Sequence, residues 1–365
     1  MTALTAARGR HPERTRPGWA GMIWVAWRQQ RVALACAGGL LGALALLLGV
    51  TGLRMQSAHG RLASRHCAAG ALLTSRCGRL QDAFYHAGYP LTGNVSLLVI
   101  CLAVLPGLVG VFAGAPLIAR ELESGTYRFA WTQAASRTRW ILAKLALPGA
   151  ALAVAAALFG SLASWWLLLA DQLPAVGGSR WQFGQFGQTA VTFTGWVLLA
   201  FAAGVFAGSA IRRTVPAMAV TAAAVGALTG ATYWKLNGLL TGLAPVTQRG
   251  RLAPYTSQSG LANSVPLTPG GGLVATPRGS WPVNVWLTTA QGHPVSFSSP
   301  RLYPLWMLKE PAQPGWLGRH HLALWVSYEP GGRFWAFQAI EGGGCLLLAL
   351  ILAAVTVWLV RRRAA

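Results

Sequence analysis

The chain has 365 residues, of which 54% are hydrophobic and only 10% are charged, and its formal net charge is +22. This composition excludes an ordinary soluble domain and is typical of a membrane protein. The positive charge would suit nucleic acid, but no zinc-finger, RNP or helix-turn-helix pattern accompanies it. We therefore expect membrane lipids as partners and no nucleic acid, since basic residues flank membrane spans. Arginine far outnumbers lysine, and alanine and glycine are abundant, which is typical of a GC-rich bacterial genome.

Six charge-poor windows are long enough to cross a bilayer, whose core needs about 20 apolar residues in a helix. They are Val32–Leu53, Val95–Ala119, Leu145–Ala170, Gln188–Ile211, Thr214–Trp234 and Phe334–Val360. The windows are continuously apolar and do not alternate, which favours helices over barrel strands. The sequence thus predicts an all-α polytopic protein of the cell membrane with six transmembrane helices.

The arginines next to the windows predict the orientation of the spans. An even number of spans puts both termini on one side. Arg212–Arg213 and Arg361–Arg363 lie directly against span ends, so we expect that side to be cytoplasmic. Residues 54–94 are an exception, because they place five arginines on the opposite side.

This orientation divides the chain into four parts. We expect a cytoplasmic tail with an interfacial helix over residues 1–31, and the first five spans over 32–234 with a cytoplasmic loop at 120–144. Residues 235–333 are rich in proline and in turn pairs, and "PVNVWLTT" has the pattern of a strand, so they predict a β-containing extracellular domain between the fifth and sixth spans. Residues 334–365 form the last span and a basic cytoplasmic tail.

Two cysteines lie between the first two windows, in "RHCAAGALLTSRCGR". Cys67 and Cys77 are ten positions apart and can close a disulfide, which would persist outside the cell. The alternative is a metal site with His59, His66 and His86, but the spacing matches no compact zinc motif, so we expect no metal.

Motifs of catalysis are missing from the sequence. There is no G-x-x-x-x-G-K-[ST] phosphate loop, no H-E-x-x-H, no G-x-S-x-G and no acid/base pair inside a span. We therefore expect no catalytic residue, no enzymatic activity of this chain alone and no cofactor bound to it.

Glycines four residues apart recur in the spans. Such pairs lie on one helical face and allow close packing, either inside the bundle or between two subunits of a dimer. The pairs are Gly38 with Gly42, Gly110 with Gly114, Gly204 with Gly208, and Gly226 with Gly230.

The stretch "ARELESGTYRFAWTQAASRTRW" (119–140) is densely charged in a chain with only eight acidic residues. Glu121 would continue the second helix, Gly125 would end it, and Ser136 would cap the third. The intervening "TYRFAWTQAA" could form a short surface helix. From the residues alone, this segment is either a solvated loop or a docking element.

The segment "GAPLIARELESGTYRFAWTQAASRTRWILAKL" resembles the first cytoplasmic loop of type-2 ABC exporter permeases, with its "RE-x-E-x-GT" run and following "S-R-x-x-W/I-x-x-K". "MIWVAWRQQR", "GSAIRRTVPAMAVT" and "FWAFQAIEGG" agree with the same family in the same order. The resemblance covers nearly the whole chain apart from residues 235–333, whose sequence matches nothing in that pattern.

The resemblance implies a half-transporter that dimerises and is driven by a separate ATPase subunit, which binds ATP and Mg²⁺. A homodimer and a heterodimer fit equally well. Lys144 matches a basic residue of the loop pattern, and Glu341 matches an acidic residue early in the last span, where a functional and a solvated role are both open. The residues expected to dock the ATPase are Arg120, Glu121, Glu123, Gly125, Thr126, Tyr127, Arg128, Phe129, Trp131 and Arg137.

The expected function is thus export of a substrate across the cytoplasmic membrane, powered by the partner. The alternative is a membrane-anchored sensor or structural protein with an extracellular binding domain. The sequence leaves the cargo, the direction of transport and the ligand of the extracellular domain open.

Overall fold

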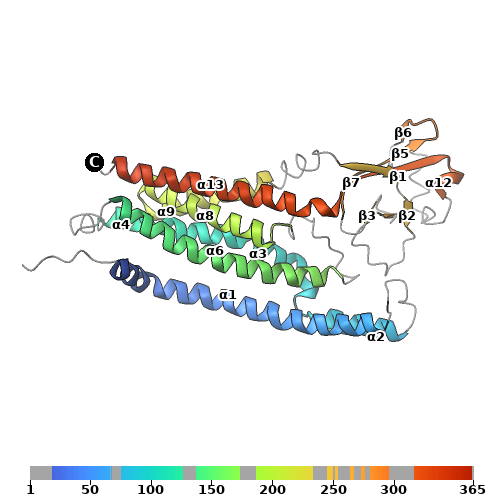
Figure 1. The fold of residues 1–365 in the computed structure, drawn as a ribbon, viewed down its shortest axis with the longest axis horizontal. Helices are drawn as coiled ribbons and strands as arrows, with labels where there is room; N and C mark the ends of the chain where they lie inside the picture. Colours follow the sequence, from blue (N-terminus) through green and yellow to red (C-terminus); the bar gives the residue numbers. More distant parts are fainter. Residues whose placement is uncertain are drawn as a thin grey trace, which may run out of the picture.

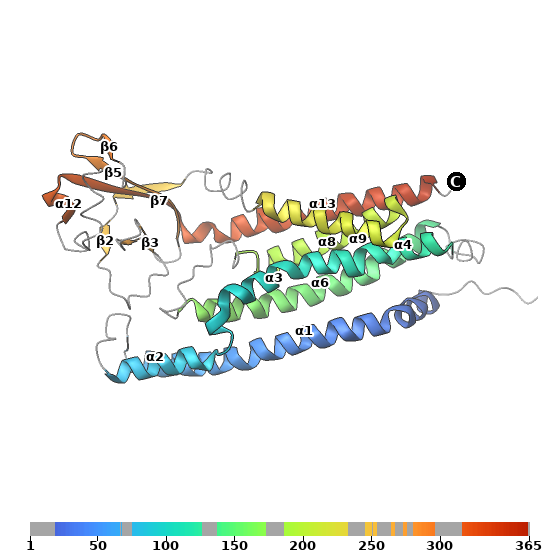
Figure 2. The ribbon, with the colours of Figure 1, turned by 180° about the vertical axis from the view of Figure 1, so that it is seen from behind.

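A computed structural model describes residues 19–65, 67, 75–125, 137–172, 186–232, 245–249, 251–253, 264–266, 273–275, 280–295 and 316–363. Long helices run side by side in a bundle, and a small β region lies beyond one end of it (Figure 1). We call this end the sheet end. At the opposite end, α4 stops, α6 starts and α13 finishes, as the reverse view also shows (Figure 2). We call that end the charged end.

Among the described residues, six helical segments are long and apolar enough to cross a membrane, which confirms the predicted number of spans. One of them is composite, because α3 (Val95–Val109) continues through a π-helical turn, η2 (Gly110–Gly114), into α4 (Ala115–Ser124). The other five are α1 (Trp19–Ser64), α6 (Arg137–Ala170), α8 (Ala190–Ile211), α9 (Thr214–Ala231) and α13 (Phe334–Arg363).

Helix α8 is the centre of the bundle. It packs against α3, α4, α6, α9 and α13. Within its apolar window, 67% of the residues are buried, compared with 11% for α6 and for α9. Its apolar residues therefore meet protein on most sides, whereas α6 and α9 keep most of their surface free for lipid.

The segment after the first apolar window is helical, where the sequence suggested a loop. Helix α1 continues unbroken to Ser64, and α2 (Ser75–Ala87) runs back along it (Figure 1). Met55, Ala58 and Leu62 recur at helical spacing on α1, and they are buried in one cluster with Phe84 of α2. This apolar stripe explains the extra turns. Because Arg54 is charged, the charge-free window ends before these turns and does not predict them.

After α2, a 3-10 turn, η1 (Thr92–Asn94), leads into α3. Thr92 is buried, and its hydroxyl donates a hydrogen bond to the Tyr85 carbonyl oxygen (2.9 Å). The connection between the hairpin and the second span is therefore tied back onto α2.

The described part of the β region contains two antiparallel sheets. The larger has the order β1 (Val246–Arg249), β7 (Leu322–Glu329), β5 (Trp281–Thr289), β6 (Pro294–Val295), and the smaller has the order β2 (Arg251–Ala253), β4 (Leu273–Ala275), β3 (Ser264–Pro266). Leu287, Leu324 and Val326 form the core of the larger sheet, against which Leu317 of α12 (Trp316–Arg319) packs. The strand predicted from "PVNVWLTT" is confirmed as β5.

Strand β7 is joined to α13 by Pro330 and one 3-10 turn, η5 (Gly331–Arg333). The carboxylate of Glu329 at the strand end is fully buried, and Arg333 Nη1 donates a hydrogen bond to its Oε2 over 2.8 Å. This ion pair fixes the turn, so the central pair of the sheet and the last helix are closely connected.

Candidate functional site

The candidate site is the charged end of the bundle, where α4, α6 and the junction between α8 and α9 lie close together. Helix α4 ends because Gly125 adopts a left-handed conformation (φ 71°), which a residue without a Cβ reaches at little cost. The predicted end of this helix at Gly125 is confirmed.

Glu121 joins α4 to α6. Lys144 Nζ forms an ion pair with Glu121 Oε1, and the two side chains are only 16% and 22% exposed. Nζ also lies 4.9 Å from the centroid of the Trp140 ring, a cation–π distance. Trp140 and Ile141 are buried in one cluster with Ile118 of α4. The ion pair therefore lies next to an apolar contact between the two helices.

Glu123 joins α4 to α9. Its Oε2 accepts one hydrogen bond from the Thr214 backbone N–H (2.9 Å) and a second from the Thr214 hydroxyl (2.7 Å). Thr214 is the first residue of α9, whose first N–H groups have no partner inside the helix. A carboxylate at a helix N-terminus is also favoured by the helix dipole. Glu123 thus caps α9 from a different helix.

The corner between α8 and α9 consists of two residues, Arg212 and Arg213. Arg212 ends α8 in a left-handed conformation (φ 60°), and its N–H donates to the Gly208 carbonyl oxygen over 3.1 Å. Both arginines are exposed, as is Arg120 of α4. The charged end therefore presents basic side chains to the outside, while Glu121 is largely covered by its contact with Lys144 and Glu123 is exposed but held by Thr214.

The two "GVFAG" stretches pack against each other. A Cβ added at Gly110 would lie 2.5 Å from the Ala200 carbonyl oxygen, and one at Gly114 would lie 2.5 Å from that of Phe201. A Cβ at Gly204 would collide with the Gly110 carbonyl oxygen, and one at Gly208 with that of Ala115. These two pairs serve packing of η2 and α4 on α8. In contrast, a Cβ added at Gly42, Gly226 or Gly230 would have no neighbouring atom within 4 Å. Among the described residues, these three glycines therefore have no close-packed partner.

The predicted docking residues divide into two groups. The structure brings together Arg120, Glu121, Glu123 and Gly125 at the end of α4. Arg137 begins α6, and its side chain lies outside the description. The remaining predicted residues fall outside the described ranges, as does Ser136: Thr126, Tyr127, Arg128, Phe129 and Trp131. Sequence reasoning missed Thr214, whose only signal is its place as the first residue of the fifth apolar window, directly after Arg213.

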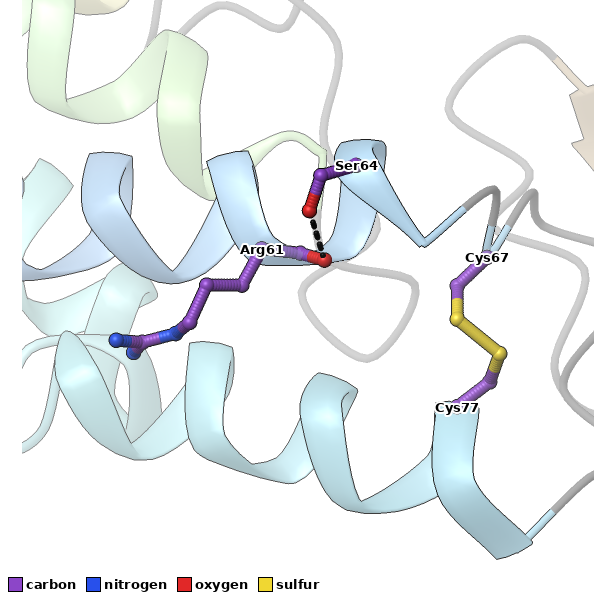
Figure 3. The surroundings of a disulfide bond; sticks show 4 residues. All are labelled: Arg61, Ser64, Cys67 and Cys77. Carbon is purple, nitrogen blue, oxygen red and sulfur yellow. Dashed lines mark hydrogen bonds between the residues drawn. A yellow bond between two sulfur atoms is a disulfide. The ribbon is translucent and has the colours of Figure 1, made fainter.

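Cys67 and Cys77 form a disulfide at the tip of the α1–α2 hairpin, with Cα atoms 5.7 Å apart (Figure 3). Because the disulfide uses both cysteines, neither thiol is available to the alternative metal site. The His59 ring lies 5.5 Å from the Phe84 ring, and no group of three potential ligands occurs in the described part of the chain. His66 lies outside it.

Glu341 belongs to a buried polar contact between α8 and α13. Its side chain is 9% exposed, and its Oε1 accepts a hydrogen bond from Trp196 Nε1 over 2.8 Å. One turn earlier, the fully buried Gln338 accepts from the hydroxyls of Thr189 and Thr192 and donates to the Phe186 carbonyl oxygen (2.9 Å). Glu341 therefore faces α8 and not solvent.

A family model described as ABC-2 membrane transporter related matches residues 38–235, just over half of the chain. The chain belongs to this family. No curated protein and no solved structure matches the chain. The matched range includes the end of α4, the start of α6, the junction between α8 and α9, and five of the six candidate spans, whereas the β region and α13 follow it.

Membership of the ABC-2 related family, together with six apolar helices, identifies a multi-pass membrane protein and suggests a membrane subunit of an ABC transporter. Permeases of this family generally work with an ATPase partner. Within the matched range, the charged end joins α4 to α6 through an ion pair and α4 to α9 through hydrogen bonds.

Proposed function

We propose that this protein is the permease subunit of a bacterial ABC-type exporter, which moves a substrate across the cytoplasmic membrane on ATP hydrolysis by a separate ATPase subunit. The observation that carries the proposal is the linkage of three helix ends at one point. Glu121 holds α4 to α6, and Glu123 holds α4 to α9. ATP and Mg²⁺ bind to the partner, and this chain supplies neither a catalytic residue nor a cofactor site.

In this proposal, Glu121 and Glu123 hold α4 to α6 and α9 and transmit force between these helices, and we call these contacts the brace. The segment 126–136 connects α4 to α6, so a force applied to it by the ATPase reaches both helices. Because Glu123 also holds the first turn of α9, the force passes to a third helix. Gly204 and Gly208 of α8 pack closely on η2 and α4, so α8 moves together with these elements.

The contact surface for the ATPase is the exposed part of the charged end, together with segment 126–136. Arg120, Arg212 and Arg213 are exposed there and carry no acidic partner among the ion pairs found in the described residues. Arginine and aromatic residues are enriched where protein interfaces carry binding energy. An acidic patch on the ATPase would complement this surface.

We propose that the charged end is cytoplasmic, with both termini on that side, and that the β region is extracellular. Arg212, Arg213, Arg361 and Arg362 lie at the charged end, in keeping with the excess of basic residues on cytoplasmic sides. The disulfide lies toward the sheet end, where an oxidising exterior would preserve it. The transporter would contain two permeases, as a homodimer or a heterodimer.

Copurification tests this function. The tagged chain, extracted gently from its native membrane, should retain a protein with a Walker A phosphate loop and no spans, and the complex should hydrolyse ATP. The matched variant combines Arg120→Glu and Arg212→Glu, which reverse exposed charges and keep Arg213, whose charge acts on Glu123, in place. It should lose the ATPase and still insert normally. If the chain copurifies with no nucleotide-hydrolysing protein, a membrane-anchored sensor becomes the better interpretation, with the turn between β7 and α13 as its link into the membrane.

A further inference from the structure

The α1–α2 hairpin carries a large excess of positive over negative side chains. Residues 54–94 contain five arginines and a single acidic residue, Asp82. All five side chains are exposed, and neither ion pair found among the described residues involves them. They are Arg54, Arg61, Arg65, Arg76 and Arg79. Unpaired guanidinium groups gathered on one element favour an anionic partner.

One of these arginines, Arg54, lies at the inner edge of the lipid headgroups, and a second, Arg61, lies within side-chain reach of them. The continuously apolar part of α1 ends at Leu53, although a longer stretch, Leu41–Ser64, also meets the length and composition of a span. We place the boundary at Leu53 because Arg54 and Arg61 are charged and exposed. Arg61 follows Leu53 by roughly 12 Å along the helix axis, and headgroups occupy about 5–8 Å beyond each face of the hydrocarbon core.

The C-terminal end of α2 lies at the same depth in the membrane interface as Arg54. A Cβ on Gly88 would contact the Met55 side chain, so the return of the hairpin meets α1 close to Arg54. The next residue, Tyr89, is 60% exposed, and tyrosine is enriched at the membrane interface. Arg54 and Tyr89 therefore mark one interfacial level on the two arms of the hairpin.

The side chains of the two arms point in opposite directions. Side chains on a helix lean toward its N-terminus, so those on α1 lean back toward the spans. Figure 3 shows the Arg61 side chain extending along α1, away from the disulfide. Arg54 and Arg61 are seven residues apart and share one face of α1 to within about 20°. Since α2 runs antiparallel to α1, Arg76 and Arg79 lean away from the spans.

We propose that Arg54 and Arg61 form a binding site for the phosphate of an anionic phospholipid, at the point where α1 leaves the membrane. A guanidinium group donates two parallel hydrogen bonds to a phosphate, and a long arginine side chain can reach back about 6 Å to bring that group into the headgroup layer. The hairpin, stapled by Cys67–Cys77 and packed through Met55 and Phe84, holds this part of α1 in place.

Lipid retention tests the site. The full chain is reconstituted into nanodiscs of equal parts phosphatidylglycerol and phosphatidylcholine, and native mass spectrometry then counts the lipids that stay bound on release. The wild-type protein should prefer phosphatidylglycerol. Arg54→Gln/Arg61→Gln should lower that preference by roughly thirtyfold, because about 1 kcal/mol per basic residue corresponds to more than fivefold for each.

The matched control is Arg76→Gln/Arg79→Gln, which removes the same charge from the arm that leans away from the membrane. Its lipid preference should stay within about twofold of the wild type, well below the roughly fivefold effect expected of a single basic residue at the headgroups. Unchanged preference in the first variant overturns the site. Equal loss in both variants also overturns it, since that result indicates diffuse attraction or a soluble polyanion at the hairpin tip.

A thiol-blocking assay of Cys67 and Cys77 in each variant verifies that the hairpin is intact. The assay and the lipid count require no ATPase and no nucleotide. Failure of the lipid site therefore leaves the proposed transport function untouched, and failure of copurification leaves the lipid site untouched.

Discussion

The carboxylate of Glu123, in the last turn of α4, accepts hydrogen bonds from both the backbone N–H and the hydroxyl of Thr214, the first residue of α9. These residues are 91 positions apart, yet the contact joins the helix before segment 126–136 to the corner of two other helices. If the ATPase pushes on that segment, this contact transmits the force from α4 to α9.

Replacing Glu123 with Gln should uncouple ATP hydrolysis from transport. The neutral amide keeps the shape of the side chain but loses the charge that favours the start of α9. Transport per ATP hydrolysed should fall by roughly two- to thirtyfold, the range of coupling energies between linked elements. Thr214→Ser, which preserves both donors, is the control and should behave as the wild type. Normal transport by Glu123→Gln would contradict the brace.

Exchanging the charges of Glu121 and Lys144 should restore what either single reversal removes. Glu121→Lys or Lys144→Glu places like charges at a half-buried contact, which should destabilise the detergent-purified protein by about 1–2 kcal/mol, between exposed and buried pairs. The double variant should recover most of that loss, as measured by thermal unfolding in a double-mutant cycle. Additive losses would show that the two residues do not interact.

A methyl group at Gly204 should be far more harmful than one at Gly230. A Cβ at Gly204 would collide with backbone atoms of Gly110 and Ala115, so Gly204→Ala should cost about 1–3 kcal/mol by overpacking. Gly230 has nothing within 4 Å, and Gly230→Ala should stabilise by up to about 1 kcal/mol through helix propensity. Thermal unfolding of both variants checks the difference, and equal effects would contradict the observed packing.

The disulfide should contribute measurably to the stability of the hairpin. Cross-linking Cys67 to Cys77 closes a loop of about ten residues, which corresponds to roughly 3 kcal/mol in the chain-entropy model. In a background without Cys36, Cys101 and Cys345, maleimide should label the protein only after reduction. Labelling of the unreduced protein in intact cells would contradict the disulfide.

Cysteines at the two ends of the bundle should react from opposite sides of the membrane. Arg213→Cys lies at the charged end and Ala290→Cys in the β region, and both native residues are exposed. In a background without free cysteines, an impermeant maleimide should label position 290 in intact cells and position 213 only after lysis. Labelling of both positions in intact cells would overturn the proposed orientation.

Much of the architecture could be predicted locally. Spans are stretches of about 20 apolar residues, so their number follows from composition along the chain. The end of α4 at Gly125 and the strand β5 follow from short-range rules of the same kind. The Cys67–Cys77 pair could be anticipated because the structure makes it from two cysteines separated by a short loop.

The hairpin shows where such reasoning stops. Arg54 interrupts the apolar window, but the helix continues because Met55, Ala58 and Leu62 find partners on α2. A window that counts charges does not detect an amphipathic helix whose apolar stripe is covered by another helix.

By itself, the sequence determined which segments are apolar enough to span, and which residues are chemically unusual within them, since both are properties of a residue and its near neighbours. Only the tertiary structure decided what those residues face. Glu121 pairs with Lys144, Glu123 accepts hydrogen bonds from Thr214, Glu341 accepts one from Trp196, and one "GVFAG" packs on the other. Each partner is far away in the chain, and a contact between distant residues depends on how helices pack, which hydropathy and spacing do not encode.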